Sequence, residues 1–179
     1  NLKFDIQNES KSLLGADLSI TANTAFSAEV KLLMDSIPGD HADLVNFVSM
    51  ALFPKTQDTK LVQVNALSGK YPYYGSFTTL PQQASDDFYL GKGVLCDQSL
   101  KLQYNLLVGD SLKLGNASFS IVGFLISAPG RAGLESAIAP LVYIPASSLE
   151  NTGLLQKGSR ITYSRFFKLP GSTDVSPQL

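Results

Sequence analysis

The feature that most constrains the fold of this 179-residue chain is a change in hydrophobic spacing near Tyr71. Before that residue, apolar side chains either recur with helical spacing or alternate as they do along half-buried strands. From Tyr71 to Leu90 no period is present, and short strand-like runs separated by turns follow as far as Thr152. A long alternating run returns at Arg160–Leu169. The spacing therefore predicts two structural parts, one inserted into the other.

The first 70 residues carry the patterns of interleaved helices and strands. In order, the spacing predicts a helix, a strand, a helix and two strands, over residues 2–14, 17–22, 27–37, 44–53 and 61–67. Gly15 stands where a left-handed residue would end the first helix, and Ser27 can cap the second. Pro38 and Gly39 end that second helix. These elements predict an open α/β layer.

The middle of the chain predicts short strands and turns. Asp97 is placed to cap a short helix, and Gly115-Asn116 is a two-residue turn between the strands of a hairpin. A short buried strand is expected at Leu141–Ile144. Ser147 and the glutamate three residues later have the spacing of a capping box, which predicts a helical turn there. The alternating run at Arg160–Leu169 is long enough to rejoin the first layer.

Composition and charge argue against nucleic acid as a partner. The 14 Lys and Arg residues nearly balance the 15 Asp and Glu residues, for a formal net charge of −1. No cluster of more than two Lys or Arg provides the basic stripe that nucleic-acid binding needs. Apolar residues make up 44% of the chain and charged residues 16%, which excludes a disordered chain.

The chain has no apolar run of 18 residues, which a membrane-spanning helix would need. It also begins without an initiator Met or a signal peptide, and a helical pattern is already under way at its first residues. We therefore expect an excised part of a larger protein.

Residues of the common catalytic and metal sites are scarce. His41 is the one histidine, and its position after Pro38-Gly39 favours a solvated loop over a metal or acid–base site. A catalytic zinc centre needs three protein ligands, and a serine hydrolase would need a Gly-x-Ser-x-Gly elbow beside this histidine. Cys96 is the one cysteine and lies in an apolar run typical of a core position. The sequence predicts no catalytic residue, no metal and no cofactor.

Candidate contact residues come from two places. Tyr71, Tyr73 and Tyr74 form an aromatic cluster beside Pro72, and tyrosine is common in interfaces because it buries area and keeps a polar tip. The alternative, which we favour, is a structural hinge into the middle region. Arg131 lies in a Gly-rich loop, where it could meet an acidic partner or face solvent. We keep all four residues as candidate partner contacts.

Several motifs occur in the order found in one family of membrane-transport proteins. They are Gly15-Ala16-Asp17-Leu18, Tyr71-Pro72-Tyr73-Tyr74-Gly75, Leu107-Val108-Gly109-Asp110-Ser111-Leu112, and the strands at Phe119–Gly123 and Pro140–Ile144. On these motifs the chain resembles the extracytoplasmic domain, or MacB-like periplasmic core, of FtsX-like ABC-transporter permeases. Gly153-Leu154 and the segment Gly158–Tyr163 are similar to the YbbP type within that family.

The resemblance implies an α+β fold in two parts. A βαβ-type porter layer comes from both chain ends, residues 1–70 and a truncated 153–179. A β-rich sabre subdomain is inserted between them at residues 71–152. The change in hydrophobic spacing at Tyr71 independently predicts the same division.

The resemblance also implies a function. The family has no catalytic residues that could be assigned to positions of this chain. It implies a periplasmic domain of an inner-membrane permease that works with a cytoplasmic ABC ATPase. The domain would transmit ATP-driven motion, or bind a periplasmic partner, in lipid- or lipoprotein-related transport. The implied partners are the membrane part of the same permease, and a periplasmic esterase or a lipid or lipoprotein substrate. The alternatives are an independent periplasmic binding module for an apolar ligand such as a lipid chain, and a hydrolase, which the single histidine disfavours.

Overall fold

A computed structural model describes residues 11–128, 139–155 and 160–172 of the chain. The helices are α1 (Lys11–Leu14), α2 (Ala28–Asp35), α3 (Ala84–Tyr89), α4 (Gln98–Tyr104), the 3-10 turn η2 (Ala146–Ser148) and α5 (Leu149–Thr152). The strands β1 to β9 are Leu18–Ala22, Asp40–Phe53, Asp58–Ser68, Thr78–Leu80, Val94–Asp97, Ser111–Leu114, Ala117–Ser127, Leu141–Pro145 and Ile161–Lys168. No helix in this described part is long and apolar enough to cross a membrane.

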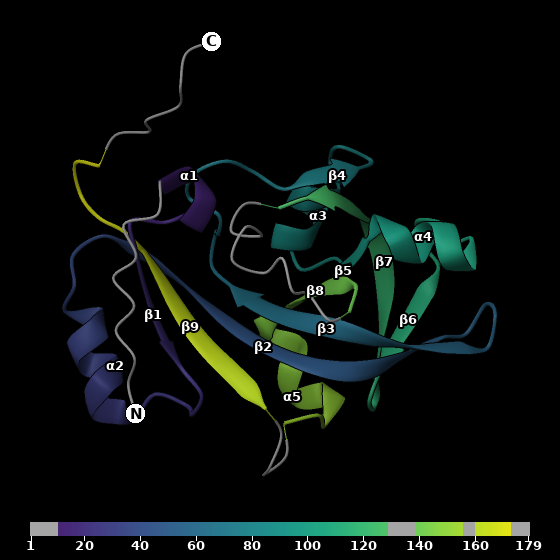
Figure 1. Cartoon of the computed structure of the whole chain (residues 1–179), viewed down its shortest axis with the longest axis horizontal. Helices are drawn as coiled ribbons and strands as arrows, with labels where there is room; N and C mark the ends of the chain where they lie inside the picture. Colours follow the sequence, from purple (N-terminus) through teal and green to yellow (C-terminus); the bar gives the residue numbers. More distant parts are fainter. Residues whose placement is uncertain (1–10, 129–138, 156–159, 173–179) are drawn as a thin grey trace.

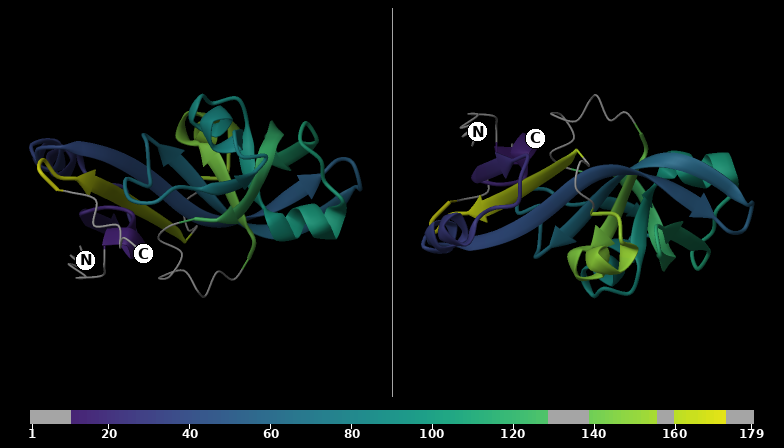
Figure 2. Two further views of the ribbon diagram at one scale, coloured as in Figure 1. Left: turned by 90° about the horizontal axis from the view of Figure 1, so that it is seen from above. Right: turned by 90° about the horizontal axis from the view of Figure 1, so that it is seen from below.

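In the described residues the strands form one nine-stranded mixed sheet, in the order β1-β9-β2-β3-β8-β5-β7-β4, with β6 paired to β2 and β7 (Figure 1). The α+β class predicted from the sequence is confirmed. The sheet is elongated: α1 and the end of β9 lie at one end of the molecule, and the β2–β3 turn lies at the other (Figure 2).

Both ends of the chain contribute to the same part of the sheet. β9 lies between β1 and β2 and is antiparallel to both, with Leu18 opposite Phe167 and Asp40 opposite Lys168. β1 and β2 are therefore parallel, and α2 connects them as a split βαβ unit. The prediction that residues 160–169 return to the N-terminal layer is confirmed.

The long β2–β3 hairpin connects this layer to the middle of the chain. Its register runs from the pair Asp43–Ser68 to the pair Phe53–Asp58 at the turn. β3 then pairs in parallel with β8, so the sheet continues without a break into the strands of the middle region. The domain boundaries at residues 70 and 152 stay a prediction.

The central strands are buried on both faces, which explains their nearly continuous apolar sequence. On β8, Val142 and Ile144 join the core cluster beneath α4, β6 and α5. The alternate residues Leu141 and Tyr143 join a second cluster, beneath α3 and residues 71–77. A third, smaller cluster joins Met34 of α2 to β1 and β9. The sheet is thus the middle layer between two sets of covering segments (Figure 2).

Local sequence signals were mostly correct. The Asp97 carboxylate accepts a hydrogen bond from the Ser99 amide at 2.9 Å, and Ser27 caps α2 through Val30 N at 3.3 Å. The prediction of a capping box at Ser147 is wrong, because α5 follows Ser148 and has no side-chain cap. The 3-10 turn η2 already includes Ser147, so this residue lies inside the helical segment instead of preceding it.

The prediction of a loop around His41 is also wrong. β2 begins at Asp40, earlier than its apolar pattern indicates, because its first residues pair with the end of β9. His41 is opposite Phe167 in that ladder and is exposed.

The contact of α3 with the sheet requires a glycine in β7. A Cβ atom on Gly123 would overlap the Cβ of Ala84, which is fully buried. We expect Gly123→Ala to lower the free energy of unfolding by about 1–3 kcal/mol, as overpacking does. Urea unfolding measures this change. Ser120→Ala, an exposed change on the same strand, is the control and should stay within about 0.5 kcal/mol of the native chain. Equal stabilities of the two variants would contradict this packing.

Candidate functional site

The segment that contains the tyrosine cluster connects β3 to β4, and we call residues 70–77 the crossover. Tyr71 and Tyr74 are 3% and 2% exposed, so their side chains lie inside the protein. Tyr73 is half-buried. The burial of Tyr71 and Tyr74 is what a structural hinge would require, and the partner contacts of these two residues stay a prediction. Arg131 lies outside the described residues, so its partner contact, like that of Tyr73, stays a prediction.

Polar groups of the three tyrosines bind the segments at residues 14–17 and 169–172. The Tyr71 hydroxyl donates to the Leu14 carbonyl at 2.8 Å, and the Tyr73 amide donates to the Gly15 carbonyl at 2.8 Å. Gly15 has φ +69°, and a Cβ there would lie 3.0 Å from the Cβ of Pro72. Only glycine therefore allows the N-terminal segment to lie this close to the crossover.

Asp17 is the centre of this contact, although its role is invisible in the sequence pattern. Its side chain is 4% exposed. Oδ2 accepts hydrogen bonds from the Tyr74 hydroxyl at 2.9 Å, the Ser172 hydroxyl at 2.6 Å and the Leu169 amide at 2.8 Å. Oδ1 faces Lys11 Nζ at 2.9 Å. One carboxylate thus joins the N-terminal segment, the crossover and the C-terminal segment. We call this the Asp17 junction.

The electrostatics of the junction keep Asp17 charged. Burial alone would raise the pKa of this carboxyl, but donors from Ser172, Lys11, Leu169 and Tyr74 outweigh it and hold the pKa well below its usual range. The same ion pair raises the pKa of Lys11, mainly through its hydrogen bond to Asp17. The folded chain therefore stabilises the charged form of the Asp17 carboxylate over its neutral form.

The aromatic rings fix the junction to the sheet. Tyr71 stacks on Phe166 of β9, with ring centroids 4.1 Å apart and planes at 20°. The Asp17 amide donates to the carbonyl of Phe167, the next residue of β9, at 2.9 Å. Lys11 and Lys168 lie over the Tyr74 ring at 5.6 and 5.9 Å, within the range of cation–π attraction.

A second charged cluster fixes α2 to the same strands. The Arg165 guanidinium binds both carboxylate oxygens of Asp43, at 2.6 and 2.9 Å, and also binds Asp35 at the end of α2. Arg165 is 6% exposed, and its hydrogen bonds to Asp43 are the main reason that its pKa is raised. The two-bond contact with Asp43 joins β9 to β2, and the contact with Asp35 fixes the end of α2 to the same guanidinium.

The one cysteine of the chain takes no part in the junction. Cys96 is fully buried in β5, and burial, together with the nearby Asp97, raises the pKa of its thiol to about 12. It therefore stays a neutral core thiol at physiological pH. In the part of the chain that the structure describes, no three His, Cys, Asp or Glu side chains are grouped as metal ligands.

Sequence analysis missed Asp17, Ser172 and Arg165 as important residues. Asp17 was interpreted as the polar start of an alternating strand and as part of a family-like motif, and its hydrogen-bond partners are as far as 155 positions away in sequence. Arg165 lies in β9 directly before Phe166 and Phe167, where a charge in a strand expected to rejoin the first layer could have indicated a buried ion pair.

Comparisons with known proteins were made by sequence and by structure. No protein-family model matches the chain. The chain is 30% identical over 104 residues to the uncharacterized ABC transporter permease YbbP of Escherichia coli (strain K12). The match covers 58% of this chain and 13% of YbbP, so the chain spans a small part of that relative's length.

By structure, the chain is similar to the periplasmic region of MacB from Actinobacillus actinomycetemcomitans, with a TM-score of 0.51 and 11% identity over 93% of this chain and 81% of that one. The extracellular domain of the noncanonic ABC-type transporter YknZ from Gram-positive bacteria gives a TM-score of 0.46 and 13% sequence identity. That comparison covers 79% of this chain and 73% of the YknZ chain. Of these two, the MacB region is similar enough to define a shared fold. The resemblance expected from the sequence is confirmed by YbbP and by this fold.

The junction makes a prediction about pH. Because the pKa of Asp17 is lower in the folded than in the unfolded chain, its stabilisation is complete above the unfolded value of about 4 and is lost as pH falls below it. We expect Asp17→Asn to cost roughly 1.5–3 kcal/mol at pH 7, the range for hydrogen bonds to a charged group. The difference from the native chain should shrink well below pH 4. Urea unfolding at both pH values measures it.

Asp58→Asn, which changes an exposed carboxylate at the β2–β3 turn, is the matched control. It should stay within about 0.5 kcal/mol of the native chain at pH 7. A deficit of Asp17→Asn that does not change with pH would contradict the charged junction.

Proposed function

We propose that this chain is the periplasmic domain of an ABC transporter permease, and that it transmits ATP-driven motion from the membrane part. The observation that carries the proposal is the Asp17 junction. Both ends of the described chain are held there, together with the crossover into the middle of the sheet.

Similarity to known proteins supports the permease assignment. YbbP is an ABC transporter permease, and the MacB structure with this fold is that of a periplasmic region. By analogy, the remainder of the protein would hold the membrane helices and bind a cytoplasmic ABC ATPase. The periplasmic partner that we propose is an esterase or a lipid or lipoprotein substrate.

The geometry of the junction suits the transmission of force. α1 immediately precedes Gly15, and Lys11 in α1 is paired with Asp17. A helix carries a displacement rigidly, at 1.5 Å per residue, whereas a flexible linker dissipates it. A displacement of α1 would therefore reach β9 through the Asp17 amide and the crossover through Tyr73 and Tyr74.

We propose no catalytic step for this chain. Cys96 is a buried neutral thiol, and His41 lies exposed in the first residues of β2. Acyl transfer would need a nucleophile, a base and an oxyanion site in mutual contact. The domain would instead act on a partner through its position.

A flexible insertion tests the transmission directly. We expect a Gly/Ser spacer between Leu14 and Gly15 of the full-length permease to abolish its function in a complementation assay. ATP hydrolysis by the partner ATPase and folding of this domain should survive, because all the strands of the sheet and the main core cluster follow the insertion point in the described chain. The assays are complementation, ATPase rate and the protease resistance of the domain.

The matched control is the same spacer between Thr56 and Gln57, in the exposed β2–β3 turn at the far end of the sheet. That variant should complement. Full complementation by the Leu14–Gly15 variant would contradict transmission and would favour the second candidate, an independent module that binds an apolar ligand.

A further inference from the structure

One edge of the sheet is open along β1. β1 pairs with β9 on one side, and no strand of the described chain pairs with its other side (Figure 1). In an antiparallel ladder, alternate residues direct their backbone N–H and C=O groups away from the paired strand. β1 therefore presents a row of backbone groups to which another strand can bind.

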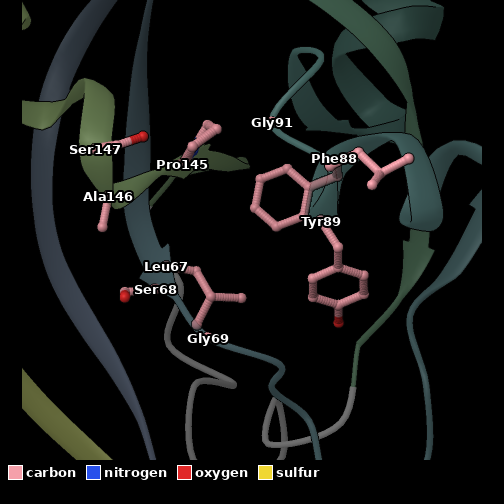
Figure 3. A pocket seen from close by; sticks show the side chains of 10 residues that line it. Leu67, Ser68, Gly69, Phe88, Tyr89, Gly91, Pro145, Ala146 and Ser147 are labelled. Carbon is pink, nitrogen blue, oxygen red and sulfur yellow. The ribbon is translucent and has the colours of Figure 1, made fainter.

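β1 lacks the features that protect such an edge in natural proteins. Its residues, Leu18–Ala22, include no charge and no proline, and its register with β9 has no bulge. β4, at the opposite edge, has three residues, a register shift between Thr78 and Thr79, and Pro81 directly after it. Short strands, bulges and prolines all oppose pairing with a further strand. The contrast indicates that β4 is a true edge and that β1 is not. The α3 side of the sheet, by contrast, holds only a shallow pocket between Leu67 and Phe88 (Figure 3).

α2 carries an uncovered apolar surface on the same side. Met34 faces the sheet and is 2% exposed, whereas Leu32 and Leu33 are each 72% exposed. Successive residues of a helix are roughly 100° apart around its axis. Asp35 binds Arg165 of β9, which places the Asp35 flank of α2 toward the middle of the sheet. Leu33 therefore lies on the opposite flank, on the open side of β1.

The strand order determines which segment can reach this edge. β9 lies between β1 and β2, so a strand that follows β9 in the chain has no room beside β9 and has to pair at an edge of the sheet. β1 provides the nearest edge, one strand away. A segment that crosses over β1 and returns parallel to β9 forms a right-handed crossover in about 98% of cases.

The same handedness gives the position of the crossing helix. α2 already connects β1 to the parallel strand β2. A crossover from β9 over β1 starts from a strand of opposite orientation and proceeds in the opposite direction along the sheet. Two right-handed crossovers related in this way place their helices on one face. The second helix would lie beside α2, on the flank that carries Leu33.

We propose that the open side of β1 and α2 binds a helix–strand segment that follows position 179 in the full-length permease. The strand pairs with β1 and is antiparallel to it, and the helix packs beside α2 on Leu33. The result is a complete βαββαβ unit, with the middle region of this chain inserted into it. The inference rests on the proposed function in one respect, since that function places these residues in a longer permease chain.

The proposed strand also bears on how force enters the domain. β9 ends at the Asp17 junction, where the Leu169 amide donates to the Asp17 carboxylate. A strand parallel to β9 ends on the same side of the sheet. The chain would therefore leave the domain at the end where α1 enters it, and both connections would act on the junction.

Hydrogen exchange, followed by mass spectrometry, tests the strand. We expect residues 18–22 to exchange at least about tenfold more slowly in the full-length permease than in the 179-residue chain, because the added strand binds the amides of the open edge. Residues 78–80 of β4 are the control and should exchange equally in the two proteins. Equal exchange of residues 18–22 would overturn the proposal.

Photocrosslinking identifies the occupant. With p-benzoylphenylalanine in place of Leu33, the full-length permease should form a crosslink to residues that follow position 179. The substitution leaves the core unchanged, because Leu33 is 72% exposed. The matched control is the same substitution at Leu102, which is 74% exposed on α4 and should give no crosslink to that segment.

A Leu33 crosslink to a second copy of the chain, to another protein or to lipid would overturn the proposal, as would the absence of any crosslink to the following segment. These measurements report structure and do not depend on transport. Slow exchange of residues 18–22 together with full complementation by the Leu14–Gly15 spacer variant would keep the partner segment and reject transmission. Fast exchange together with loss of complementation would do the reverse.

Discussion

The buried carboxylate of Asp17 is the interaction on which the arrangement of the chain ends depends. A charge taken out of water is costly unless donors replace the water, and here the donors come from α1, the crossover and the residues after β9. None of the three segments can satisfy the carboxylate alone. They must therefore be ordered together, which makes the junction one cooperative unit instead of three separate loops.

The sheet connects the Asp17 junction to the rest of the domain. β9 lies between β1 and β2, so β9 pairs directly with the strand that begins the long β2–β3 hairpin, and β1 is joined to that strand through β9. That hairpin runs from Asp40, beside the junction, to a turn at the far end of the sheet, and β3 continues into β8 and the middle strands (Figure 1). The continuous strand pairing supports the proposal that the domain moves as one body when its ends move. This property underlies the proposed transmission of force.

The sequence predicts local elements well, because hydrophobic spacing and helix caps depend on nearby residues. α2 with its Ser27 cap, the β6–β7 hairpin and the return of β9 to the first layer were all expected. The junction could not be predicted in the same way. The hydrogen-bond partners of Asp17 are distant in sequence. The favoured hinge did not show which acceptors the hydroxyls of Tyr71 and Tyr74 would bind. Ser147 misled for a different reason, since the 3-10 turn before α5 took the place of a side-chain cap.

Native-state hydrogen exchange tests the central claim, that the junction opens as one unit. Three amides report on it: Asp17 N bonded to Phe167 O, Tyr73 N bonded to Gly15 O, and Leu169 N bonded to the Asp17 carboxylate. We expect the three to share one opening free energy, and Ser172→Ala to lower all three by the same amount. Fast exchange at Tyr73 with full protection at Asp17 and Leu169 would contradict the account, because the crossover would then open independently of the chain ends.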